Sequence, residues 1–162
     1  MLYVSRRLLA LSAPALLLLA TLALSPTAGA QTGGATAADK AKDEPPFSAY
    51  KGVRIGMTAD EARKLLGSPT DKDDKQEVFN VSEEESCQVY YDAAKKVSAV
   101  SITYFTSKAV PGPKSVLGEE PEARQDGSFS KLIRFPKAGY WVSYTRTSGD
   151  SPMTIIAIQK LK

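Results

Sequence analysis

The sequence contains no histidine, a single cysteine and a single tryptophan. Without imidazole the commonest general base is missing, and with it the usual Ser and Cys catalytic triads and most zinc sites. Cys87 has no second cysteine with which to form an internal disulfide, so we expect it to be buried as a small apolar residue. No paired constellation of Lys, Asp or Glu takes the place of these groups. The sequence therefore predicts a protein that is not an enzyme and uses no cofactor.

A strong charge of one sign is also missing. The chain carries 21 basic and 18 acidic residues, and the two become nearly equal once Arg6 and Arg7 are removed with the leader described below. No attraction to nucleic acid or to anionic lipid follows. The acidic groups at 71–74 and 83–85 lack the Gly and terminal Glu spacing of an EF-hand loop, so we expect solvated loops and no metal site.

The first thirty residues have the pattern of an export signal. A short basic start is followed by the apolar run LLALSAPALLLLATLAL and by small residues at Ala28 and Ala30, which predicts cleavage between Ala30 and Gln31. An uncleaved membrane anchor is the alternative, because the run approaches the roughly 20 residues that span a bilayer. The general secretory and twin-arginine routes both stay open. Since no Cys lies near the cleavage point, we expect a periplasmic or secreted protein that is not a lipoprotein and keeps no integral membrane segment after cleavage.

The segment 31–46, QTGGATAADKAKDEPP, has small and charged residues without apolar periodicity. It is typical of a flexible linker. Phe47 and Tyr50 supply the first aromatic groups that can enter a core, so the folded part is expected to begin there.

The segment IGMTADEARKLLGSP, at 55–69, predicts a two-turn helix. Thr58 and Glu61 have the spacing of a capping box, in which each side chain accepts a hydrogen bond from the other residue's backbone N–H. Gly67 favours a left-handed helix end, and Pro69 prevents continuation. The apolar stripe of this helix is formed by Ala62, Leu65 and Leu66.

Short runs with β-prone residues follow the helix. They lie at 77–81, 87–92 and 97–105, and the last run alternates Val, Ile and Tyr with Ser and Thr, as a half-buried strand should. One helix and three antiparallel strands are therefore expected in the first part of the folded chain.

The remainder of the chain repeats this plan. KLLGSP is echoed by SVLGEEP, QVYYD by WVSYT and VSAVSITY by MTIIAIQK, while FSKLIRF takes the place of EVFNV. The second helix is degenerate, because the two prolines of PGPKSVLG leave little more than one turn. The sequence predicts an α+β fold of two helix-plus-antiparallel-meander units, at 47–108 and 109–162, with the second packed on the first. Whether they form one sheet or two stays open.

The stretch GMTADEARKLLGSP, with strands after it and an export signal before it, resembles the small outer-membrane assembly family called SmpA/OmlA or BamE. The duplicated arrangement resembles the fold of the β-lactamase inhibitor protein. These resemblances imply an α+β fold with an antiparallel sheet, and a protein that works by binding other proteins. BamE proteins are lipoproteins, whereas this chain lacks the Cys that would carry the lipid.

Protein-binding residues are predicted in the second unit. Tyr, Trp and Arg dominate interface hot spots, and the run around residue 140 is rich in them. Alternation places Tyr140, Val142 and Tyr144 on one side of a strand and Trp141 on the other. If the first row fills the core, Trp141 is the residue on the exposed face. The candidates are Arg134, Tyr140, Trp141, Tyr144 and Arg146.

Three functions follow as hypotheses. The first is an exported, non-enzymatic protein-binding module, an accessory to envelope or outer-membrane protein assembly, with protein partners in the cell envelope. The second is a secreted inhibitor of an extracytoplasmic hydrolase. The third is a domain that binds cell wall or a small ligand on one face of its sheet.

Overall fold

A computed structural model of the chain describes residues 44–105 and 109–162. The predicted signal peptide at 1–30, and the linker up to residue 43, lie outside the described residues. The described residues belong to one compact unit. Within them, Tyr50 is buried and Phe47 packs against the core.

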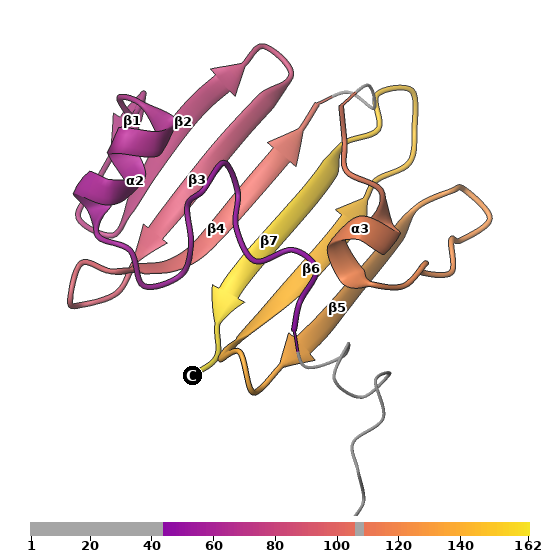
Figure 1. The fold of residues 1–162 in the computed structure, drawn as a ribbon. Coiled ribbons are helices and arrows are strands. Elements are labelled where there is room, and N and C mark those ends of the chain that lie inside the picture. The colour runs from indigo at the N-terminus through magenta and orange to yellow at the C-terminus, as the bar shows by residue number, and fades with distance from the viewer. Residues whose placement is uncertain (1–43, 106–108) are drawn as a thin grey trace, which may run out of the picture. The chain divides into compact units, whose positions relative to one another are not determined.

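The unit is built on a single seven-stranded sheet in which every pair of neighbouring strands is antiparallel. In space the strands follow the order β1-β2-β3-β4-β7-β6-β5, which Figure 1 shows from the side of the helices. Their bounds are β1 Asp71–Lys72, β2 Gln76–Ser82, β3 Glu85–Tyr91, β4 Val97–Tyr104, β5 Phe129–Phe135, β6 Tyr140–Arg146 and β7 Thr154–Lys160.

Helix α2, Ala59–Leu66, has the capping box that the sequence predicts. The Glu61 N–H donates to Thr58 Oγ1 at 3.3 Å, and the Thr58 N–H donates to Glu61 Oε2 at 2.7 Å. Gly67 ends the helix at φ 91° and ψ −156°. This conformation differs from the predicted left-handed one, but it also has a positive φ that favours glycine.

Helix α3, Pro113–Leu117, has five residues and ends at Gly118, whose φ of 81° and ψ of −5° are left-handed. Its shortness agrees with the two prolines before and within it. Both buried side chains of this helix, Val116 and Leu117, belong to the main core cluster.

All of these covering elements lie on one face of the sheet. In Figure 1, α2 lies over β1 and β2, α3 over β6 and β5, and the segment before α2 crosses between them over β4 and β7. The core sits between these elements and the strands, where the most completely buried large side chains include Phe79, Ile102, Ile156 and Ile158. No described helix or loop covers the opposite face, which we call the open face.

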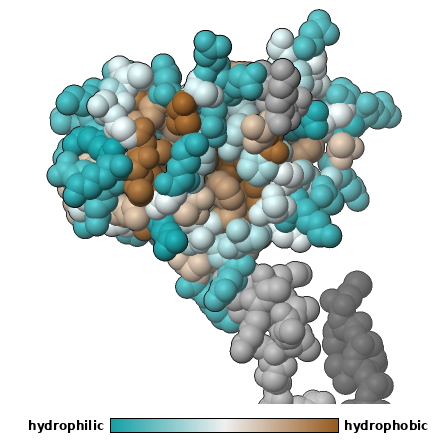
Figure 2. All heavy atoms as spheres, turned by 45° about the horizontal axis from the view of Figure 1, so that its top comes forward, coloured by the Kyte–Doolittle hydropathy of each residue, from teal (hydrophilic) through white to brown (hydrophobic). Residues whose placement is uncertain are grey.

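The surface on the side of the helices is largely hydrophilic, with hydrophobic residues showing in small areas between polar ones (Figure 2). Leu65 is one of the exposed apolar side chains, with 47 % of its surface accessible. The predicted helix stripe is therefore wrong at this position: Ala62 is buried, whereas Leu65 lies beside Gly52 at the rim. Among the described residues, no helix is long and apolar enough to cross a membrane.

The predicted α+β class is wrong. The structure is mainly antiparallel β, with two short helices, and it does not consist of two helix-plus-meander units. The question of one sheet or two, which the sequence leaves open, has one answer in the structure: β4 pairs with β7 through six residue pairs and joins all strands into one sheet. The α+β fold implied by the BamE resemblance is corrected with it. The positions of the six longer strands agree with the predicted runs, while β1 lies in a segment predicted as loop.

Candidate functional site

The open face is formed by the strand residues that point away from the helices. Pairing of the strands arranges them in rows that run across the sheet. The first row is Gln76, Tyr90, Ala99, Gln159, Trp141 and Arg134. The middle row is Asp71, Val78, Gln88, Ser101, Ala157, Ser143 and Leu132. The last row is Asn80, Ser86, Thr103, Ile155, Thr145 and Ser130.

These rows are almost free of charge. Arg134 and, on the edge strand β1, Asp71 are the charged residues among them, although 24 % of the whole sequence is Asp, Glu, Lys or Arg. Some of the polar groups satisfy one another: Gln88 Nε2 donates to Gln76 Oε1 at 3.0 Å, and the hydroxyls of Ser130 and Thr145 are 2.8 Å apart. Depletion of charge is one compositional mark of the centre of a protein interface, and enrichment in aromatic residues and Arg is another.

The first row, which we call the aromatic row, holds the aromatic side chains of the three rows. Tyr90 and Trp141 stand on β3 and β6, separated by Ala99 and Gln159 on the two central strands. Three strand spacings separate their columns, about 14 Å. Tyr90 and Trp141 are both half-buried, so each exposes part of an amphipathic ring.

Two shallow depressions lie along the aromatic row and share Gln159. The first, ≈ 440 Å³, is lined by Lys75, Tyr90, Tyr91, Ser98, Ala99, Val100, Ser101, Ala157 and Gln159. The second, ≈ 430 Å³, is lined by Arg134, Trp141, Gln159, Lys160, Leu161 and Lys162. The side chain of Gln159 makes no hydrogen bond to another described residue, so its amide can pair with a partner group.

The pairing of the sheet has an approximate two-fold symmetry that makes the aromatic row distinctive. Ser101 and Ala157 pair in the middle of β4 and β7, and half a turn about this point exchanges β2 with β5, β3 with β6 and β4 with β7. The same half turn exchanges the aromatic row with the last row, where Thr145 stands at the place of Tyr90 and Ser86 at the place of Trp141. The two rows occupy equivalent positions in the pairing of the strands. Strand pairing alone therefore does not explain why only one of them has aromatic residues.

The structure brings two of the predicted binding residues together. Arg134 and Trp141 are paired across β5 and β6, and both line the second depression. The turn at 136–139 connects β5 to β6 and so brings Arg134 beside Trp141. In this turn the Ala138 N–H donates to Phe135 O at 3.1 Å, and Gly139 has a φ of 80°. The sequence predicts a hairpin turn at this position.

The other three candidates lie elsewhere. Tyr144 is buried on the helix-covered face, where its ring stacks on Phe129 at 5.3 Å and its hydroxyl donates to Pro111 O at 3.1 Å. Its pKa is raised by burial. Tyr140 is half-buried on the same face and packs on Phe135 at 6.5 Å, and burial raises its pKa too. Arg146 is exposed at the far end of β6. These residues do not share the open face with Trp141.

Sequence reasoning missed Tyr90 and Gln159. Strand alternation contains the signal for both: Tyr90 is out of phase with the buried Cys87 and Val89, and Gln159 with the buried Ile158. Their position in one row with Trp141 depends on the pairing of β4 with β7, for which the sequence alone offers no local signal.

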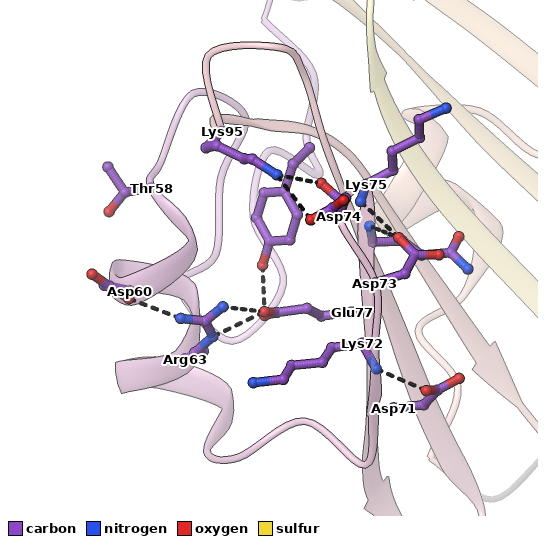
Figure 3. A network of polar contacts seen from close by, with 12 residues as sticks. Thr58, Asp60, Arg63, Asp71, Lys72, Asp73, Asp74, Lys75, Glu77 and Lys95 are labelled. Carbon is purple, nitrogen blue, oxygen red and sulfur yellow. Dashed lines mark hydrogen bonds and ion pairs between the residues drawn. The ribbon is translucent and has the colours of Figure 1, made fainter.

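A partly buried ion pair fixes α2 to the sheet. Glu77 on β2 is 2 % exposed and accepts hydrogen bonds from the Arg63 guanidinium, with Arg63 Nε at 2.9 Å, and from Tyr91 Oη at 2.9 Å. Figure 3 shows Arg63 reaching from the helix to Glu77 and to Asp60. The hydrogen bond to Glu77 raises the pKa of Arg63, and burial raises that of Tyr91. The full pairing of these groups indicates a structural role.

The acidic side chains at 71–74 also form hydrogen bonds and ion pairs with nearby residues of the chain. Asp73 Oδ1 accepts from the backbone N–H groups of Lys75 and Gln76 at 2.6 and 2.9 Å, and Lys95 Nζ lies 3.8 Å from Asp74 Oδ1 (Figure 3). In the described part of the chain, no three His, Cys, Asp or Glu residues are arranged so that they could hold a metal ion.

Comparison of the sequence with family models and with curated proteins, and of the structure with solved structures, gave no match.

Proposed function

We propose that this chain is an exported, non-enzymatic protein-binding module, and that the open face of its sheet is the binding surface. The observation that carries the proposal is the near absence of charge from a broad sheet face that no described element covers. Export is supported by the leader-like first thirty residues.

The size and residue types of the face support a protein partner. Strands β2 to β7 have seven or eight residues each and together span roughly 25 by 25 Å, a footprint comparable with a large part of the about 800 Å² that one partner buries in a standard interface. Trp141, Tyr90 and Arg134 are of the residue types that dominate binding energy when a partner removes them from water.

Site-specific photo-crosslinking tests the proposal. A photoreactive amino acid would replace Leu132, which is 45 % exposed on the open face, or Leu65, which is 47 % exposed on the helix side. We expect a defined protein adduct from position 132 in cells that export the chain, and none from position 65. Trp141→Ala should abolish the adduct at 132, while the matched Leu65→Ala change should leave it intact.

Equal adducts from both positions, or adducts that Trp141→Ala leaves unchanged, would refute the open face as the binding surface. The identity of the adduct separates the hypothesised roles, because an envelope-assembly accessory gives a membrane complex and an inhibitor gives a single soluble hydrolase. Retention on peptidoglycan without a protein adduct would favour the cell-wall alternative.

A further inference from the structure

Three basic residues are among those that line the depression at the Trp141 end of the open face. Arg134, Lys160 and Lys162 line it together with Trp141, Gln159 and Leu161, and no carboxylate side chain is among the lining residues. The centre of the open face is uncharged, so this end is the part of the surface where charge decides which partner fits.

The positive charge is only partly balanced within the described chain. Lys160 is 57 % exposed, and its Nζ lies 3.8 Å from Asp92 Oδ2. Arg134 is exposed and forms no ion pair with another described residue. A partner that covers this end must remove the guanidinium from water, which is costly unless the partner supplies an anion.

We propose that the partner protein places an acidic segment in this depression, with a carboxylate at Arg134 and the adjoining aliphatic groups on the Trp141 ring. Arg134 can bind such a carboxylate through two parallel hydrogen bonds, and the amide of Gln159 offers a further donor at the floor. This inference rests on the proposed function and names the chemistry of the partner.

A protein segment accounts for the surface better than an acidic glycan does. A sugar chain would need the aromatic row and its two depressions alone, whereas the loss of charge extends over all three rows of the open face. A folded partner with an acidic segment at one end covers the whole of this area.

Because Trp141 is the single tryptophan of the sequence, its fluorescence reports binding at this depression. The full chain would be titrated with an eight-residue glutamate-rich peptide without aromatic residues, and with glutamine-rich and lysine-rich peptides of equal length, while Trp141 emission is recorded. We expect a saturable change with the glutamate peptide that weakens at high salt, and binding at least about tenfold weaker for the other two.

Arg134→Glu should lower the affinity for the glutamate peptide by about tenfold or more, and Arg134→Gln should lower it less. Lys64→Glu makes the same charge change at an exposed position on α2, on the covered side, and should leave the affinity unchanged. Urea denaturation of each variant would show that it folds.

An equal response to the glutamine peptide, or full binding by both Arg134 variants, would overturn the inference. Tighter binding of an oligogalacturonate than of the glutamate peptide would overturn the assignment to a protein segment. If the crosslinker at position 132 traps a partner while the glutamate peptide gives no response, the proposed function is supported and the inference of an acidic segment is refuted.

Discussion

At the scale of single residues, position in the sheet decides what chemically similar side chains do. Tyr144 and Trp141 are three residues apart, yet one fills the core and the other stands on the open face. Likewise Glu77 is buried and fully paired, while Asp60 binds the same guanidinium from an 83 % exposed position. Residue type alone would not separate these roles.

Glu77 is expected to be important for stability. Glu77→Gln leaves the Arg63 guanidinium without its buried anion and weakens the Tyr91 hydrogen bond, so we expect the free energy of unfolding to fall by about 2 kcal/mol. Urea denaturation measures this change. Asp60→Asn is the matched control, because it removes the exposed partner of the same Arg63 and should cost much less. Equal losses would mean that burial does not set the strength of this pair.

Asp126 should contribute to stability above its pKa. Its carboxylate accepts from Ser128 Oγ at 2.7 Å, from the Ser128 N–H at 3.0 Å and from Ser148 Oγ at 3.0 Å, and these bonds lower its pKa, the Ser128 hydroxyl most of all. Because the folded pKa lies below the unfolded one, the stabilisation is complete at neutral pH and is lost as pH falls through the folded value.

The Asp126→Asn variant should therefore be less stable than the wild type at pH 7, and the difference should shrink at pH 3. Urea midpoints at the two pH values measure it. Asp150→Asn, at an exposed position with no hydrogen bond to the described residues, serves as the control. A difference that stays constant with pH would contradict the assignment.

At the scale of elements, the sequence predicted the local structure well because local signals determine it. Alternation located β2 to β7, and the Thr58–Glu61 spacing located the start of α2. The two-residue β1 was missed, since its pairing depends on β2 and not on its own composition.

Thr58→Ala tests the helix start. Loss of the hydroxyl leaves the Glu61 N–H without its acceptor, and we expect the free energy of unfolding to fall by about 1 kcal/mol. Thr58→Ser keeps the hydroxyl and should retain most of the stability. If both variants melt like the wild type, the capping box does not stabilise α2.

At the scale of the whole molecule, the sequence failed to predict how the strands join. Nothing local distinguishes β4 and β7 as neighbours, because their pairing brings together residues such as Ile102 and Ile156 that are far apart in the chain. The aromatic row could not be predicted from the sequence for the same reason, because it depends on the pairing of distant strands. The sequence shows Trp141 and Arg134, which one hairpin connects, but Tyr90 and Gln159 reach them only through the complete sheet.

A single sheet predicts that both halves unfold together. Cys87 on β3 is buried, and burial raises its thiol pKa to about 12, so it should resist alkylation at pH 8 until the protein unfolds. The fluorescence emission of Trp141 on β6 reports the unfolding of the other half of the sheet. We expect the same urea midpoint from both probes. Two separated midpoints would show that the halves are independent.

Because β5 is the last strand of the sheet, Arg134 also affects how this sheet edge can pair with another chain. Among the described residues β5 pairs only with β6, so its outer backbone groups form an open edge onto which another chain could add a strand. Lys131 and Arg134 put charge on the two sides of this edge, and natural proteins use such charges to prevent aggregation. Replacing Arg134 by an apolar residue would therefore confuse lost recognition with aggregation, whereas Arg134→Glu keeps the edge charged while it reverses the sign that a partner meets.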